Sequence, residues 1–125
     1  MRRMIPVLFT LLLLTGCGGG EKEASYRQIS QEEAKEMMDA QEVIILDVRE
    51  QDEYDSGHIP GAVLLPVGAI DEDTAAAVIP EKDATVLVYC RSGNRSKTAS
   101  SALAELGYTN VYEFGGIKTW PYETE

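Results

Sequence analysis

Short apolar runs alternate with amphipathic segments along most of the chain. The stretches 43–46 and 84–89 are continuous apolar runs, typical of strands that are buried on both faces of a parallel sheet. Shorter runs over 26–29, 62–65 and 110–112 predict three further strands. Because strands that alternate with helices imply βαβ crossovers, the pattern predicts an α/β fold with a mostly parallel sheet covered on both faces.

Helical segments separate the predicted strands. Ser30 and Glu33 have the spacing of a capping box, which predicts a helix over 31–40. Asp71 is the expected N-cap of another helix. The helix that Asp71 caps is predicted to end at Val78, giving segment 71–78. Further helical segments are predicted over 50–56 and 96–106, with a short helix carrying Trp120 after Gly115-Gly116.

The first residues have the character of a targeting segment. Two arginines precede an apolar stretch, 4–14, that is shorter than the roughly 20 residues needed to span a bilayer. Small residues then lead to Cys17, so segment 1–16 resembles a bacterial lipoprotein signal peptide. This resemblance implies cleavage before Cys17, a lipid anchor on its thiol, and an extracytoplasmic protein that is periplasmic or at the cell surface. The alternative is an ordinary cleaved signal and a secreted protein.

One folded domain is expected after this segment. Residues 17–25 form a lipidated cysteine and a polar, glycine-rich tether, and residues 26–125 form the domain. The 125-residue chain carries a net charge of −10, which argues against nucleic acid and anionic lipid as electrostatic partners. An anionic substrate must therefore be held by local positive groups.

The candidate active site is the loop 90–96, Cys90-Arg91-Ser92-Gly93-Asn94-Arg95-Ser96, between a strand end and a helix start. Ligands bind at such positions in open α/β sheets, where backbone N–H groups converge on an anion. The same groups, with Arg91 and Arg95, are expected to lower the pKa of the Cys90 thiol and make it a nucleophile. The alternative is a buried structural cysteine.

Several motifs, in this order, resemble a single rhodanese domain over roughly 26–120. They are Leu46-Asp47-Val48-Arg49-Glu50, Glu53-Tyr54, Gly57-His58-Ile59-Pro60-Gly61-Ala62, the loop 90–96 and Gly115-Gly116. The resemblance implies a three-layer α/β/α fold with a five-stranded parallel sheet in the order 3-2-4-5-1. It also implies a sulfurtransferase, in which Cys90 takes a sulfane sulfur from thiosulfate or a persulfide and passes it to cyanide, a thiol or a thiol protein.

The residues fit this chemistry by themselves. Cys90 supplies the thiolate, and the N–H groups of 91–96 stabilise an anionic leaving group such as sulfite. Neither a metal nor an organic cofactor is expected, because no Cys/His cluster has metal-ligand spacing.

Two other functions stay open. Cys-based phosphatases related to rhodaneses place an arginine six positions after the cysteine, whereas Ser96 stands at that position here and Arg95 at position five. The shorter spacing favours a sulfur atom over a phosphate or arsenate. The second alternative is a rhodanese-like sulfur-carrier or redox module that does not turn over thiosulfate efficiently.

Polar residues around the loop have predicted supporting roles. Arg91 is interpreted as the charge that faces the substrate and Arg95 as the clamp of the loop, although both could be solvated arginines at a helix start. Asp47 ends a neighbouring strand, where it either pairs with Arg95 or is a surface or capping carboxylate.

Arg49 is expected to form a structural ion pair with Glu50 or Glu53. His58 lies in a turn and is interpreted as structural, since a thiolate that is already formed needs no base. Packing roles are predicted for Tyr54 and Trp120.

Overall fold

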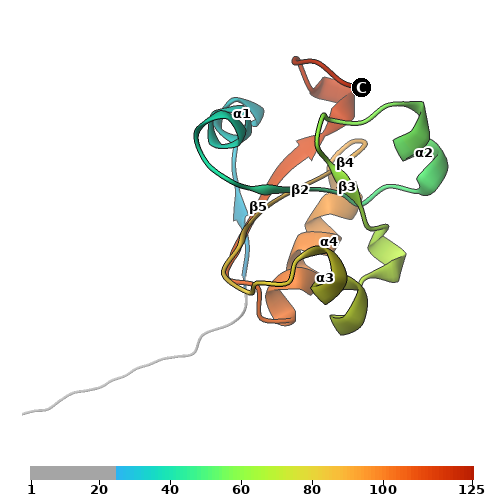
Figure 1. Cartoon of the computed structure of the whole chain (residues 1–125). Helices are drawn as coiled ribbons and strands as arrows, with labels where there is room; N and C mark the ends of the chain where they lie inside the picture. The colour runs from blue at the N-terminus through green and yellow to red at the C-terminus, as the bar shows by residue number, and fades with distance from the viewer. Residues whose placement is uncertain (1–24) are drawn as a thin grey trace, which may run out of the picture.

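A parallel five-stranded sheet organises the protein, with its strands in the order β1-β5-β4-β2-β3 (Figure 1). The strands are β1 Arg27–Gln28, β2 Ile44–Asp47, β3 Val63–Leu64, β4 Thr85–Cys90 and β5 Asn110–Gly116. Read from the opposite edge, this is the order 3-2-4-5-1, so the expected rhodanese-like topology is confirmed. The computed structural model describes residues 25–125, and the expected signal peptide, Cys17 and nearly all of the tether lie outside the described residues.

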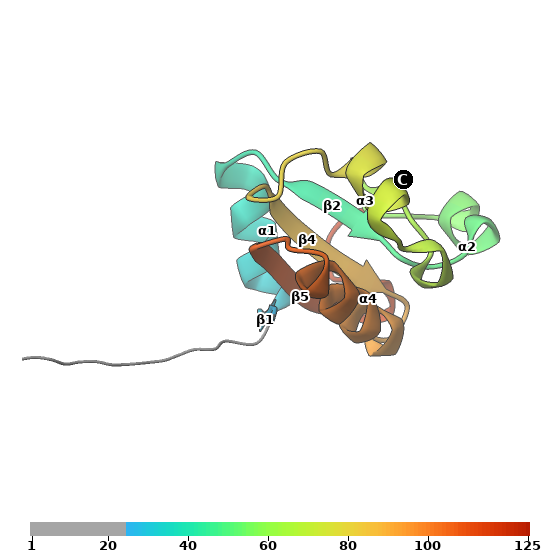
Figure 2. The same ribbon diagram turned by 90° about the horizontal axis from the view of Figure 1, so that it is seen from below.

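Helices cover both faces of the sheet, with α1 on one side and α3 and α4 on the other (Figure 2). The α-helices are α1 Gln31–Ala40, α2 Gln51–Ser56, α3 Glu72–Val78 and α4 Asn94–Glu105, and the short 3-10 helices are η2 Val67–Ala69 and η3 Ile117–Thr119. None of the helices within 25–125 is long and apolar enough to cross a membrane.

The continuous apolar run of β4 is explained by the two cores that it serves. Successive residues of a strand point to opposite faces. Val86 and Val88 therefore pack with α3 and α4, whereas Leu87 and Tyr89 pack with α1. Trp120 joins the α1 side of the core, which confirms its packing role.

Local capping signals set the starts of two helices as predicted. The Ser30 side chain accepts the N–H of Glu33, and the Glu33 carboxylate accepts the N–H of Ser30. Asp71 caps α3 through the N–H of Thr74. These reciprocal bonds satisfy N–H groups that have no partner inside the helix.

The structure corrects the predicted start of α4. The helix begins at Asn94 rather than Ser96, because Gly93 adopts a left-handed conformation with φ of 110° and turns the chain directly into the helix. Only residues 91–93 therefore separate β4 from α4. Strand β5 also extends beyond the predicted 110–112, up to Gly116, and Trp120 follows a 3-10 turn instead of lying within a helix.

Candidate active site

Cys90 lies at the C-terminal end of β4, between the neighbouring strands β2 and β5. Its side chain is free and only 1% of the residue is exposed. The pairing of β4 with β5 shifts register between Val88 and Cys90, where Val88 faces Glu113 and Cys90 faces Gly116. Such irregularities re-aim side chains next to active sites.

The loop after Cys90 surrounds its sulfur with hydrogen-bond donors. The N–H of Gly93 donates to Sγ at 3.0 Å, and Sγ lies 3.4 Å from the Ser96 hydroxyl. Burial raises the pKa of the Cys90 thiol. Hydrogen bonds from the Ser96 hydroxyl and from the N–H groups of Ser96, Gly93 and Ser92 lower it, and together they outweigh burial, so the pKa falls below its ordinary value. Hydrogen bonds within the loop, rather than the two guanidinium groups, are thus the main causes of the lowered pKa.

Gly116 lets this loop lie against β5. A Cβ atom on Gly116 would lie 2.0 Å from the Arg91 carbonyl oxygen and 2.6 Å from the Ser92 nitrogen. The Arg91 carbonyl accepts the N–H of Lys118 at 3.1 Å. The end of β5 therefore fixes the position of the loop backbone, and with it the position of the loop N–H groups relative to Sγ.

The two arginines of the loop have different surroundings. Arg91 is exposed and forms no ion pair with any residue in 25–125, so its charge is available to an incoming anion. Arg95 bonds both carboxylate oxygens of Glu53, at 2.8 and 2.9 Å. The hydrogen bond from Arg95 lowers the pKa of Glu53 to about 2. Arg95 was predicted to clamp the loop, but its ion pair with Glu53 holds the start of α4 to α2 instead.

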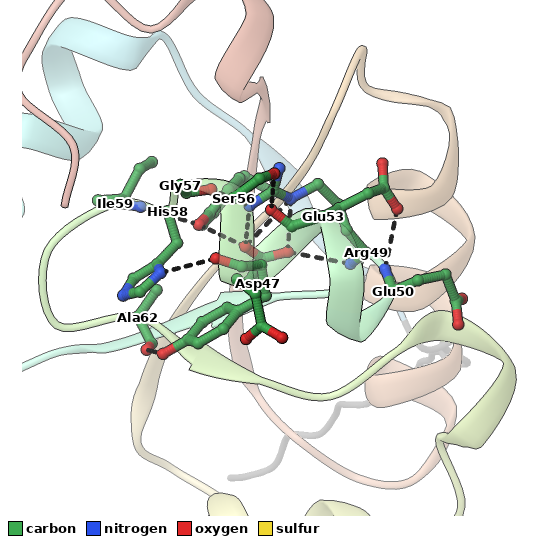
Figure 3. Close-up of polar contacts among 12 residues, drawn as sticks. Asp47, Arg49, Glu50, Glu53, Ser56, Gly57, His58, Ile59 and Ala62 are labelled. Carbon is green, nitrogen blue, oxygen red and sulfur yellow. Dashed lines mark hydrogen bonds and ion pairs between the residues drawn. The ribbon is translucent and has the colours of Figure 1, made fainter.

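Asp47 does not pair with Arg95, contrary to one of its two predicted roles. Its carboxylate is fully buried and bonds the Arg49 guanidinium, with Oδ2 2.6 Å from one terminal nitrogen (Figure 3). The hydroxyl of Tyr89 donates to the same oxygen at 2.7 Å. A surface position is also wrong, because Asp47 is 0% exposed, but its Oδ1 accepts the backbone N–H of Arg49 at 3.0 Å, as a capping carboxylate does.

Arg49 reaches back two residues along its own strand end. It therefore pairs with Asp47, and not with Glu50 or Glu53 as predicted. The same guanidinium donates to the Gly57 carbonyl at 2.7 Å (Figure 3). This arrangement joins the end of β2 to the turn after α2.

His58 is held in a structural position. Its ring stacks on Tyr54, with centroids 3.9 Å apart, and its Nδ1 lies 3.0 Å from the Tyr54 carbonyl oxygen. Its Nε2 lies 3.4 Å from the carboxylate of Glu125. The Tyr54 hydroxyl donates to the Ala62 carbonyl at 2.6 Å. The two ring nitrogens thus face partners in α2 and in the C-terminal segment, which agrees with the structural role predicted for His58.

Glu113 is a buried carboxylate of β5, 2% exposed, that was not predicted from the sequence as part of the site. Its Oε2 lies 2.5 Å from the Ser96 hydroxyl and accepts the N–H of Gly115 at 3.0 Å. Oε1 accepts the Gln28 amide at 3.2 Å. The available signal was a carboxylate directly inside a strand that leads to Gly115-Gly116, but the predicted strand ended one residue earlier.

The arrangement suits a small anion and covalent chemistry at sulfur. Backbone N–H groups and a helix N-terminus stabilise negative charge at a fixed point. Across residues 25–125, no group of three or more His, Cys, Asp and Glu side chains is placed to hold a metal ion. The groups that can act on a substrate here are the Cys90 thiolate, its ring of donors and the exposed Arg91.

Comparisons with known proteins agree with this geometry. The thiosulfate sulfurtransferase GlpE of Coxiella burnetii is 38% identical over 96 residues, which cover 76% of this chain and 87% of GlpE. The putative sulfur carrier protein YrkF of Bacillus subtilis is 36% identical over 107 residues, which cover 84% of this chain and 56% of YrkF.

A solved structure of a rhodanese with anions from E. coli has the same fold. It superposes with a TM-score of 0.63 at 33% identity and covers 67% of this chain and 98% of that chain. The rhodanese-like domain model matches residues 30–122, a span that contains strands β2 to β5 and the loop around Cys90. The chain therefore belongs to the rhodanese-like domain family.

Proposed function

We propose that this protein is a sulfurtransferase that carries a sulfane sulfur on Cys90. The observation that carries the proposal is the surroundings of Sγ, which is held by the N–H of Gly93 and faces the Ser96 hydroxyl. Neutral donors stabilise a thiolate without forming an ion pair that would compete with its attack on a substrate. The proposed donor is thiosulfate or a persulfide, and the acceptor is cyanide, a thiol or a thiol protein.

The first half-reaction transfers one sulfur atom to the enzyme. The Cys90 thiolate attacks the outer sulfur of thiosulfate, and the bond between the two sulfur atoms of thiosulfate breaks. The electron pair of that bond leaves on sulfite, and Cys90 becomes a persulfide anion. Arg91, the residue after Cys90, is exposed to solvent. Its positive charge attracts the thiosulfate dianion to the loop, although the net charge of the chain, −10, repels anions.

The second half-reaction regenerates the thiolate. The acceptor attacks the outer sulfur of the persulfide, and the electron pair of the broken S–S bond returns to Cys90. The N–H groups of Ser92, Gly93 and Ser96, which lower the thiol pKa, also stabilise the persulfide anion between the two steps.

The loop geometry favours sulfur transfer over phosphate or arsenate chemistry. At the sixth position after the cysteine, the chain presents the Ser96 hydroxyl to Sγ at 3.4 Å. The nearby Arg95 is bound to Glu53 and does not close over the loop. Arg95 therefore does not close over the sulfur in the way that a phosphate-binding arginine would, and the donors of the loop converge on Sγ instead.

A sulfur-carrier function is the second candidate, and the likeness to the putative carrier YrkF favours it. Cys90 is only 1% exposed, so an acceptor has to reach into the loop to take the sulfur. In this case the persulfide forms as above, but only a matched partner protein removes it.

Thiocyanate formation and intact-mass analysis of the full chain test both candidates. After incubation with thiosulfate, we expect the protein to gain one sulfur atom and to form thiocyanate when cyanide is added. Cys90→Ala should do neither, and Ser101→Ala on the exposed side of α4 should behave as the unchanged protein. A persulfide without thiocyanate would favour the carrier. No added sulfur with thiosulfate, polysulfide or glutathione persulfide would contradict the proposal.

We also propose that Cys17 is lipidated and that the domain works outside the cytoplasm, on the membrane that the anchor enters. The support is the order of basic, apolar and small residues before Cys17. Several acyl chains together give stable anchoring where one does not. Mass spectrometry of Cys17 from a membrane fraction should show the lipid, and an unmodified Cys17 would remove the anchor from the proposal.

A further inference from the structure

We propose that Glu53 is a specificity-determining residue for the sulfur donor. By binding Arg95, it withholds a guanidinium from the loop after Cys90. It thereby shifts the donor preference from the thiosulfate dianion toward donors with one negative charge, such as the persulfide of a small neutral thiol. The inference deepens the proposed function, because it rests on Cys90 receiving sulfur from a donor, and it names the charge of that donor.

Arg95 is placed where its charge can act on the site. It lies in the first turn of α4, directly before Ser96, whose hydroxyl lies 3.4 Å from Sγ of Cys90. The pKa of Arg95 is raised chiefly by its hydrogen bonds to Glu53, and the charge of Cys90 raises this pKa further. The guanidinium is therefore within electrostatic reach of the sulfur. Its side chain is 34% exposed, so a free guanidinium would also meet an anion that enters from solvent.

Glu53 occupies this guanidinium through both carboxylate oxygens. The two terminal nitrogens of Arg95 donate to Oε1 at 2.8 Å and to Oε2 at 2.9 Å. This paired geometry is the one by which an arginine binds two oxygens of an anion. The same two N–H groups are thus not free for the oxygens of thiosulfate. The hydrogen bond from Arg95 lowers the pKa of Glu53 to about 2, so the pair carries no net charge at neutral pH.

Helix α2 holds the Glu53 carboxylate in place by a second contact. Its Oε1 accepts the N–H of Glu50 at 2.9 Å, in the capping box at the start of α2 (Figure 3). This bond satisfies an N–H group that has no partner inside the helix. Glu53 is therefore fixed by its own helix, and Arg95 is drawn to a carboxylate that is already ordered.

The other charged groups around the loop do not replace this guanidinium. Glu113 places a buried carboxylate against the first turn of α4. Arg49, at the end of the neighbouring strand, is bound to Asp47. Arg91 and Lys118 are exposed, so water and salt weaken their fields. The loop N–H groups stabilise the single charge of a thiolate or persulfide, but further negative charge on the donor meets little compensation.

Two small donors isolate the effect of charge on the transfer step. Methanethiosulfonate has a methyl group where thiosulfate has an oxyanion, so it carries one negative charge instead of two. The Cys90 thiolate attacks the outer sulfur of either donor, and the S–S bond of the donor breaks. The electron pair leaves on sulfite or on methanesulfinate, and Cys90 becomes a persulfide anion. A free guanidinium would favour the donor with the larger charge.

The test is the rate at which each donor loads sulfur onto the full chain, measured by intact mass after quenching at subsaturating donor. Glu53→Gln removes the charge but keeps an oxygen that can accept the N–H of Glu50. We expect the ratio of the loading rate constants, thiosulfate over methanethiosulfonate, to rise about two- to fivefold. Both donors react with the same thiol, so a change in thiolate content or in the folded fraction cancels in the ratio. The rise should shrink at high salt.

Two controls separate the release of Arg95 from the general loss of a negative charge. Asp52→Asn removes the neighbouring exposed carboxylate of α2 and should change the ratio by less than about 1.5-fold. In an Arg95→Ala background, Glu53→Gln should raise the ratio no more than Asp52→Asn does. A ratio that Glu53→Gln leaves unchanged would overturn the proposal, as would an equal rise with and without Arg95.

The same measurement distinguishes this inference from the proposed function. If both donors load one sulfur atom onto Cys90 but the ratio does not respond to Glu53→Gln, the specificity role of Glu53 is wrong and sulfur transfer stands. If neither donor nor a persulfide loads sulfur onto the unchanged protein, the sulfurtransferase proposal is wrong, and the inference is wrong with it.

Discussion

Two neighbouring strands each end in a buried side chain that can carry a negative charge, the Asp47 carboxylate on β2 and the Cys90 thiol on β4, and the two have different partners. Asp47 ends β2 and Cys90 ends β4, and the strands pair in parallel with Asp47 opposite Tyr89. Asp47 is bonded to a full positive charge on Arg49, and it also accepts the hydroxyl of Tyr89. Cys90 instead meets the dipoles of the Gly93 N–H and the Ser96 hydroxyl.

The difference shows how one edge of a sheet supports both stability and reactivity. A charge bound to its counterion is fixed, and removing either partner leaves a costly unpaired charge in the interior. A thiolate held by dipoles is stabilised without a counterion, so its electron pair stays available to a substrate. We therefore expect changes at Asp47 to affect folding and changes around Cys90 to affect chemistry.

The largest expected effect follows from Asp47→Asn. Breaking a buried pair by removing one partner costs about 3–5 kcal/mol, because Arg49 keeps an uncompensated charge. Urea denaturation should show the loss of unfolding free energy, while the rate for each folded molecule stays within about threefold. Asp39→Asn, in the exposed Lys35–Asp39 pair, is the control and should leave the denaturation midpoint nearly unchanged. An unchanged midpoint in Asp47→Asn would contradict the assigned role.

Gly116→Ala should have the next largest effect, this time on the reaction. The new Cβ would meet the Arg91 carbonyl oxygen at 2.0 Å, so the loop has to move away from β5. A displacement of about 1 Å can cost roughly 100-fold in rate, and we expect a loss of this size in kcat for thiocyanate formation. Gly68→Ala is the matched control, because its Cβ meets nothing within 4 Å. Full activity in Gly116→Ala would show that the loop tolerates the displacement.

Arg91→Ala should weaken binding of the anionic donor with a smaller effect. Since Arg91 is exposed, we expect the KM for thiosulfate to rise about three- to tenfold and kcat to fall less. The rise should shrink at high salt, where the interaction is screened. Steady-state kinetics at two ionic strengths measures both effects, with Lys97→Ala on the exposed side of α4 as the control. An unchanged KM would remove Arg91 from substrate binding.

The smallest effect concerns the pair between Glu53 and Arg95. The hydrogen bond from Arg95 lowers the pKa of Glu53 from 4.5 to about 2, so its stabilisation is present above pH 4.5 and is lost as the pH falls toward 2. The side chains are 26% and 34% exposed, and we expect no more than about 1 kcal/mol after solvent screening.

Denaturation of Glu53→Gln across this pH range checks the prediction. At neutral pH the variant should be less stable than the unchanged protein, and the difference should vanish near pH 2. Asp52→Asn, at the neighbouring exposed position of α2, serves as the control. A difference that grows on acidification would have the wrong sign for a carboxylate with a lowered pKa.

Local signals in the sequence determined most of the fold and the position of the reactive group. The buried runs of β2 and β4, the caps at Ser30 and Asp71, and the loop after Cys90 were all readable, because each depends on residues within a few positions of one another. They established the α/β class, and the resemblance to rhodanese domains supplied the strand order that the structure confirms.

Only the tertiary structure decided which charges meet. Arg95 finds Glu53 across 42 residues of sequence, and Ser96 finds Glu113 across 17 residues because α4 packs against β5. A carboxylate can pair with any cation that packing brings within reach, so sequence spacing does not choose among Arg49, Arg91 and Arg95. The identity of the nucleophile could therefore be predicted from the sequence, whereas the residues that stabilise it depend on how the strands and helices pack.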